Sequence, residues 1–144
     1  MLEQIHHENW KELSVLTGTA EHVPKAVLGL LAKDRKSFDA AYWKLDNYVV
    51  VQGDLFSSAA ILPKYLEEVV VKSKFKESVI DLIWQIGTGY SENIELQSTC
   101  FAEAFKAFNS LIKHPLIAST KYAEMIKAEL DDMVEIEVER KQNT

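Results

Sequence analysis

The chain contains an internal repeat with a period of 39 residues. When the sequence is shifted against itself by this amount, Pro24-Lys25 falls on Pro63-Lys64, and the apolar residues that follow the two prolines coincide. The coinciding apolar pairs are Val27 and Leu66, Leu30 and Val69, Leu31 and Val70, Ala40 and Val79, Ala41 and Ile80, Trp43 and Leu82, and Leu45 and Trp84. Proline is accepted in the first turn of a helix, where its missing N–H costs no hydrogen bond. Each block is therefore predicted to form two antiparallel helices, the first of which begins at a proline.

Helical spacing of apolar residues continues outside the repeat, and only three prolines and five glycines interrupt the sequence. Apolar residues three and four positions apart indicate amphipathic helices, and no stretch alternates strictly enough to form a series of strands. We therefore expect an all-α chain of about seven helices. Their approximate ranges are 8–16, 22–32, 35–50, 57–71, 74–86, 91–113, and 115 or 118 to 141. A kink or restart is expected at Pro63. The runs of β-branched residues at 49–51 and 69–71 are predicted to be helical because the flanking residues keep the helical spacing.

A period of about 40 residues, with two antiparallel helices in each repeat, is typical of HEAT and armadillo solenoids. Stacking such pairs buries a continuous core. A length of 144 residues is ordinary for one domain. We predict a single HEAT-like α-solenoid domain over residues 1–144, with repeats at about 22–50 and 58–88 and a helical C-terminal cap at 91–141. The predicted core residues are Leu30, Leu31, Ala41, Leu45, Leu66, Val70, Ile80, Trp84, Phe105 and Phe108.

The stretch from Val23 to Trp84 carries a second pattern. The segment VPKAVLGLLA is followed by AAYWKLDNYVVVQGDLFSSAAILPKYLEEVV and then by another apolar helix. This order resembles short bacterial HEAT-like repeat proteins, in which a helix leads into a Gln-Gly turn, an aromatic residue, small residues and a proline-started helix. Those positions are occupied here by Gln52-Gly53, Phe56, Ala59-Ala60 and Pro63. The resemblance implies a protein-binding solenoid. The group that the chain resembles includes immunity proteins of contact-dependent inhibition and other polymorphic toxin systems.

Negative charge is concentrated in the second half of the chain. The whole chain carries a net charge of −6. Residues 24–76 contain nine Lys or Arg and six Asp or Glu, whereas residues 77–139 contain four and twelve. An acidic surface disfavours nucleic acid, whose phosphates require a positive footprint, and attracts basic proteins. Acidity that serves only solubility is the alternative interpretation.

The sequence contains no motif for catalysis, for a metal or for a cofactor. The four histidines lack the spacing of a zinc site such as H-E-x-x-H, and no Gly-rich phosphate loop follows a strand. Cys100 is the single cysteine, so no internal disulfide is possible, which fits a reducing compartment. Neither a secretory signal nor an apolar run long enough for a membrane span is present. We expect a cytoplasmic protein that is not an enzyme, with no cofactor, no nucleic acid partner and no membrane partner.

Three functions remain open at this point. The first is an immunity protein that neutralises a toxin, most simply a basic nuclease domain, by covering its active site. The second is a HEAT-like adaptor for an unrelated protein. The third is a helical-repeat enzyme of the DNA-glycosylase kind, which the acidic second half opposes because such enzymes need a basic groove. The residues predicted to contact a basic partner are Asp39, Tyr42, Asp46, Asp54, Tyr90, Glu129, Asp131, Asp132 and Glu135.

Overall fold

The computed structural model describes residues 1–143, and in this part of the chain it is mostly helical, as predicted. The six α-helices are α1 (Val23–Gly29), α2 (Arg35–Asp46), α3 (Leu62–Lys72), α4 (Lys76–Thr88), α5 (Ile94–Leu111) and α6 (Lys121–Gln142). Three short 3-10 helices accompany them: η1 (Leu2–His7), η2 (Trp10–Glu12) and η3 (Ser57–Ile61). The remaining regular structure is two hairpins, formed by β1 (Ser14–Val15) with β2 (Gly18–Thr19), and by β3 (Val50–Val51) with β4 (Asp54–Leu55).

Both proline-started helices of the repeat are present. Pro24 lies in the first turn of α1 and Pro63 in the first turn of α3. The restart expected at Pro63 is confirmed, since η3 ends at Ile61 and α3 begins at the next residue. Three other helices begin at capping side chains that accept a hydrogen bond from a backbone N–H of the first turn. These caps are Asp34 for α2, Asn93 for α5 and Thr120 for α6.

The helix predicted at 8–16 is wrong. The N-terminal segment instead folds as η1, η2 and strand β1. Its polar groups pair with distant partners rather than with the next turn of a helix. The backbone N–H of Ser14 donates to Ser57 Oγ at 2.7 Å, and that of Leu16 donates to the Tyr48 carbonyl at 2.9 Å. The indole N–H of Trp10 donates to the Ile5 carbonyl at 2.7 Å, which closes the segment on itself.

The predicted extension of the second repeat helix to residue 50 is also wrong. Helix α2 ends at Asp46, and Val50–Val51 pairs with Asp54–Leu55 in an antiparallel hairpin. Gln52 and Gly53 form the turn with φ angles of 51° and 86°, the left-handed conformation at both central positions of the favoured two-residue hairpin turn. Here the β-branched run and the Gln-Gly turn outweigh the helical spacing. The second β-branched run, at 69–71, lies inside α3 as predicted.

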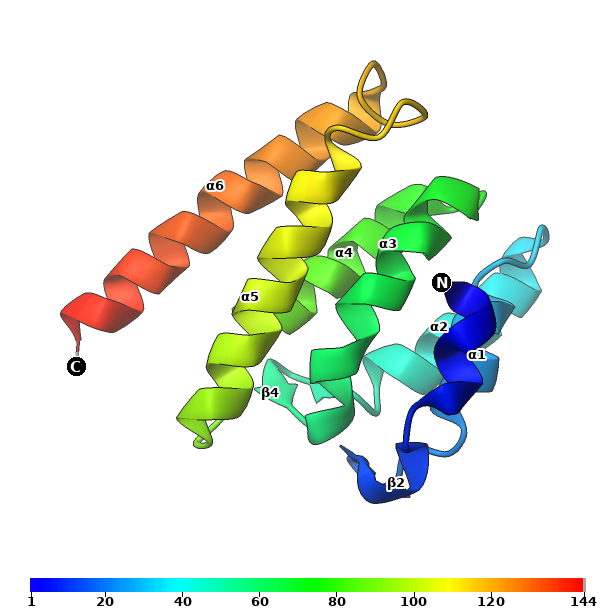
Figure 1. Ribbon diagram of the computed structural model, residues 1–144, viewed down its shortest axis with the longest axis horizontal. Helices are drawn as coiled ribbons and strands as arrows, with labels where there is room; N and C mark the ends of the chain where they lie inside the picture. Colours follow the sequence, from blue (N-terminus) through cyan, green and yellow to red (C-terminus); the bar gives the residue numbers. More distant parts are fainter. Residues whose placement is uncertain (144) are drawn as a thin grey trace.

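The helices lie in chain order across the molecule (Figure 1). Helix α1 packs on α2 and α3 packs on α4, while α5 lies against α3, α4 and α6. Helices α5 and α6 run in opposite directions, with α6 at one edge of the molecule and the α1–α2 pair at the other (Figure 1). The second helices of the successive pairs are therefore α2, α4 and α6.

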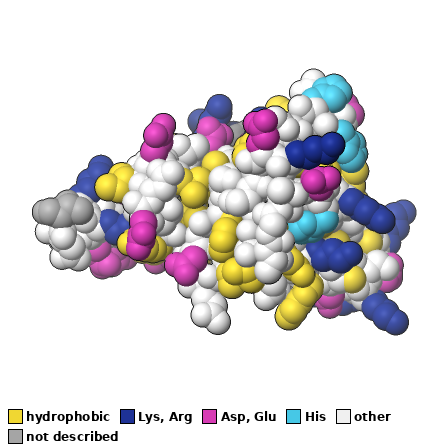
Figure 2. All heavy atoms as spheres, turned by 90° about the horizontal axis from the view of Figure 1, so that it is seen from below, with side chains coloured by type: hydrophobic (Ala, Val, Ile, Leu, Met, Phe, Trp, Pro, Cys, Tyr) yellow, Lys and Arg dark blue, Asp and Glu magenta, His cyan; other side chains and the backbone are white. Residues whose placement is uncertain are grey.

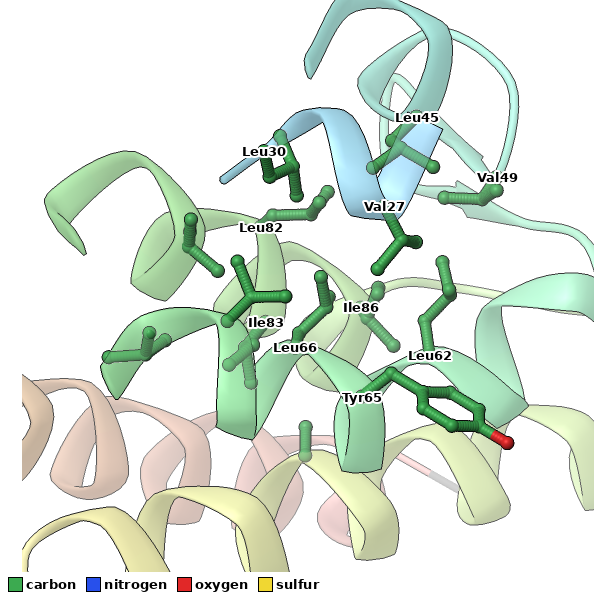
Figure 3. Close-up of a cluster of buried hydrophobic side chains, with 14 of the residues drawn as sticks. Val27, Leu30, Leu45, Val49, Leu62, Tyr65, Leu66, Leu82, Ile83 and Ile86 are labelled. Carbon is green, nitrogen blue, oxygen red and sulfur yellow. The ribbon is translucent and has the colours of Figure 1, made fainter. Parts of the chain in front are cut away.

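A continuous apolar cluster joins these helices. Figure 3 shows side chains from α1, α2, α3 and α4 meeting at its centre, among them Val27, Leu45 and Leu66. Seven of the ten predicted core residues are buried, whereas Leu31, Trp84 and Phe105 are only half-buried. Trp84 departs from the prediction because its indole N–H bonds to Asp132 near the surface, at the junction of α4 and α6.

Candidate partner-binding face

Helices α2 and α4 are joined by side chains from equivalent positions of the repeat. Tyr42 and Asp81 are 39 residues apart, and the Tyr42 hydroxyl donates a long hydrogen bond of 3.5 Å to Asp81 Oδ2. Gln85, on the next turn of α4, donates from Nε2 to the same Asp81 oxygen at 2.8 Å and to the Tyr42 hydroxyl at 3.4 Å. The polar sides of the two second helices are thereby held together.

Helix α6 joins the same surface through α4. The Trp84 indole N–H donates to Asp132 Oδ2 at 2.7 Å, which fixes the position of this carboxylate. Glu129 lies one turn earlier on α6 and is half-buried, close enough to Asp81 and Asp132 to be repelled by both. Asp46 of α2 is also half-buried and close enough to Asp81 to be repelled by it. We call the four carboxylates Asp46, Asp81, Glu129 and Asp132 the acidic face.

Two of these carboxyl groups have a perturbed affinity for protons. The pKa of Asp46 is raised mainly by burial and also by the charge of Asp81, against the opposing effect of a hydrogen bond from Gln85. The pKa of Glu129 is raised by burial first and then by the charges of Asp81 and Asp132. The folded chain therefore holds like charges close together on a partly dehydrated surface.

Among residues 1–140, no Lys, Arg or His side chain forms an ion pair with any of the four carboxylates of the acidic face. The described residues also contain no group of three or more His, Cys, Asp or Glu side chains that could hold a metal ion. Charge that the chain leaves uncompensated in this way is complementary to Lys and Arg side chains of another molecule.

A hollow of about 450 Å³ lies beside the acidic face, between α4, α6 and the β3–β4 turn. Trp84, Ile136 and Arg140 form part of its wall. The Arg140 guanidinium donates to the backbone carbonyls of Thr88 at 2.7 Å and Gly89 at 3.2 Å, so it satisfies the C-terminal end of α4. The hollow therefore combines an apolar part of its wall with the Asp81 carboxylate at its edge.

The structure brings together four of the nine residues predicted to contact a partner, namely Tyr42, Asp46, Glu129 and Asp132. The other five are not joined to this group by any hydrogen bond or ion pair found among the described residues. Asp39 is exposed and forms an ion pair with Arg35 at 3.0 Å. Asp54 and Tyr90 lie next to each other at the edge of the β3–β4 hairpin, where the Tyr90 N–H donates to the Gly53 carbonyl. Asp131 and Glu135 project from the solvent-exposed side of α6.

Sequence reasoning missed the residues at the centre of this face, Asp81 and Gln85, and placed Trp84 in the core. The 39-residue repeat contained the missing signal. Asp81 and Gln85 stand 39 residues after Tyr42 and Asp46, and the structure places Asp81 beside Tyr42.

Comparisons with known proteins identify no relative of this chain. A scan against protein-family models finds no match. Searches of curated proteins and of solved structures find no similar protein or structure either. The HEAT-like resemblance therefore rests on the sequence pattern alone. Among the described residues, no helix has both the length and the apolar character needed to cross a bilayer.

Removing the charge of Asp46 and Glu129, the two carboxyl groups whose pKa is raised, is expected to stabilise the fold. A raised pKa means that the folded state binds the proton more tightly than the unfolded state, so ionisation above that pKa costs stability. The double variant Asp46→Asn/Glu129→Gln should melt about 1–3 °C above the wild type at pH 7, as expected for partly exposed charges. The difference should shrink towards zero near pH 3, below the ordinary carboxyl pKa values of about 3.9–4.3, because the cost of ionisation is absent once both states are protonated. Thermal melts at both pH values test this. The matched control is Asp131→Asn/Glu135→Gln on the exposed side of α6, for which little change is expected; an equal gain in the control would contradict the account.

Proposed function

We propose that this chain is a HEAT-like α-solenoid that binds a basic protein on the face formed by α2, α4 and α6, and that it acts as an immunity protein against a basic nuclease toxin. The observation that carries the proposal is the convergence of four carboxylates from three separate helices, none of which forms an ion pair with a Lys, Arg or His side chain of residues 1–140. Such a surface is costly to the fold, as the raised pKa values of Asp46 and Glu129 indicate, and a binding role accounts for that cost.

The proposed mechanism is steric and electrostatic. A nuclease binds the phosphates of its substrate with Lys and Arg side chains. The acidic face would present carboxylates to those same side chains and so exclude the nucleic acid. Trp43 supplies an aromatic group for this interface, since it lies on α2 between Asp39 and Asp46 and is 63% exposed. Exposed aromatic residues of this kind frequently anchor protein–protein interfaces.

A growth assay tests this function directly. The function requires a large secreted protein to be encoded next to the gene for this chain, and the probe is the C-terminal domain of that protein, expressed from an inducible promoter in a bacterial host. Co-expression of the wild-type chain is expected to restore growth, and the triple variant Asp46→Lys/Asp81→Lys/Glu129→Lys is expected to fail. The variant Asp131→Lys/Glu135→Lys serves as the control and should still protect.

The assay also separates the immunity function from the adaptor alternative. An adaptor would bind a protein partner without restoring growth. Loss of growth in the presence of the wild-type chain would therefore contradict the immunity function. Equal protection by the triple variant and the wild type would contradict the assignment of the acidic face.

A further inference from the structure

A second surface lies at the opposite edge of the molecule, between α1 and α2. Its floor consists of small residues, with Ala26 and Gly29 on α1 and Ala40 and Ala41 on α2, and it encloses about 200 Å³. A Cβ atom added to Gly29 would lie 2.7 Å from the Ala41 Cβ, so the two helices approach each other closely at this point. The result is a narrow furrow with an apolar floor that the chain itself leaves open. We call it the α1–α2 furrow.

The rim of the α1–α2 furrow is basic. Lys25 and Lys44 border it from the two helices, both are exposed, and neither forms an ion pair with another residue of 1–143. The His22 ring also lies at the rim, with Nε2 3.0 Å from the Lys44 carbonyl oxygen. Figure 2 shows that most of the Lys, Arg and His side chains visible in that view gather at the end of the molecule away from the C-terminal helix.

Helix α6 has an exposed side that is apolar and acidic, and so complements the apolar floor and basic rim of the α1–α2 furrow. Val134 and Val138 are 46% and 48% exposed and lie one turn apart, so they form a short apolar ridge. Asp131 and Glu135 flank this ridge and are also exposed. Helix α6 packs mainly on α4 and α5, and the exposure of Val134 and Val138 shows that the described chain leaves this side open. The acidic face lies on a different side of the helix, because Glu129 and Asp132 are directed towards α4.

We propose that α6 of one copy of this chain docks into the α1–α2 furrow of a second copy. The apolar ridge would fill the floor of small residues, and Asp131 and Glu135 would pair with Lys25 and Lys44. The furrow and the ridge lie at opposite edges of one molecule (Figure 1), so they cannot meet within a single chain. The contact joins two different surfaces, and copies would therefore associate head to tail rather than as a two-fold dimer. The acidic face stays free in this arrangement, so the proposal stands independently of the proposed function.

Sedimentation velocity of the purified chain over a range of concentrations tests this association. The wild type is expected to rise above its monomer mass of 16.4 kDa at low salt and to return towards it at high salt. Two charge reversals should each weaken self-association by about tenfold or more, because like charges would face each other across the contact. They are Lys25→Glu/Lys44→Glu in the furrow and Asp131→Lys/Glu135→Lys on α6.

The decisive sample combines all four substitutions in one chain. It restores opposite charges across a head-to-tail contact and keeps the wild-type net charge of −6. Its self-association should match the wild type to within about threefold. Non-specific charge repulsion between copies would rank the variants differently. The α6 reversal changes the net charge from −6 to −2, because each substitution adds two positive charges. If repulsion alone controlled association, this variant would associate more strongly than the wild type. The proposal would be overturned if the wild type stays at monomer mass at all concentrations in low salt. It would also be overturned if the variant with all four substitutions stays at monomer mass.

Discussion

Phe108→Ala is expected to destabilise the fold by about 3–5 kcal/mol, the usual cost of removing a buried aromatic side chain. Phe108 lies on α5 and is 0% exposed within the apolar cluster. Helix α5 contacts α3, α4 and α6, so a cavity at this position would loosen the packing of three helices together. Chemical denaturation of the wild type and the variant gives the difference in unfolding free energy.

Phe105 provides the matched control on the same helix. Its ring is only half-buried and stacks on Phe101 with a centroid distance of 5.6 Å. Phe105→Ala should therefore cost clearly less than Phe108→Ala, although helical spacing alone puts both residues in the core. Leu45→Ala should fall in the range of about 2–5 kcal/mol, since Leu45 is 0% exposed. An equal loss at Phe105 and Phe108 would show that the apolar side of α5 is placed incorrectly.

Removing charge from the acidic face is expected to slow association with a basic partner by about tenfold or more at low salt. The variant is Asp46→Asn/Asp81→Asn/Glu129→Gln, which keeps the size of each side chain while removing three charges. Its association rate with the toxin domain should also depend less on salt, because fewer charges remain to be screened. Surface plasmon resonance at two ionic strengths measures both quantities.

Two comparisons interpret the kinetic result. Asp131→Asn/Glu135→Gln removes charge of the same sign from the exposed side of α6 and is expected to change the association rate much less. Trp43→Ala should act mainly on dissociation, because a desolvated aromatic group contributes to the lifetime of a complex more than to its formation. If the control and the triple variant slow association equally, the effect is one of net charge and the acidic face has no special role.

The sequence predicted the helical class and the two helices that begin at prolines because both depend on local spacing. The position of Pro24 and Pro63, the apolar residues behind them and the restart of α3 follow from helix geometry alone. The N-terminal segment and the β3–β4 hairpin do not follow from helix geometry. At Ser14 and Leu16 the backbone pairs with residues more than thirty positions away, and such long-range partners are not contained in a local pattern.

The candidate site was predictable only in part, for a related reason. Negative charge on α6 and at Asp46 is visible in the composition, but its convergence depends on which helices become neighbours. Asp81 is unremarkable as one acid on one helix and becomes central when Tyr42, Gln85 and Glu129 pack around it. Applying the 39-residue repeat to polar positions as well as apolar ones would have placed Asp81 beside Tyr42. The repeat does not extend to α6, so it does not predict that Asp132 lies near these residues.

Amide chemical shifts can show whether a basic partner binds on the second helices of the three pairs, α2, α4 and α6. The chain is labelled with ¹⁵N and titrated with the unlabelled toxin domain, and the shifted amides are mapped onto the structure. If the acidic face is the binding surface, the largest shifts are expected to cluster on α2, α4 and α6 around Asp46, Asp81 and Asp132, and the indole N–H of Trp84 is expected to shift with them. Shifts concentrated on α1, α3 and α5, with the Trp84 indole signal unmoved, would contradict binding at the acidic face.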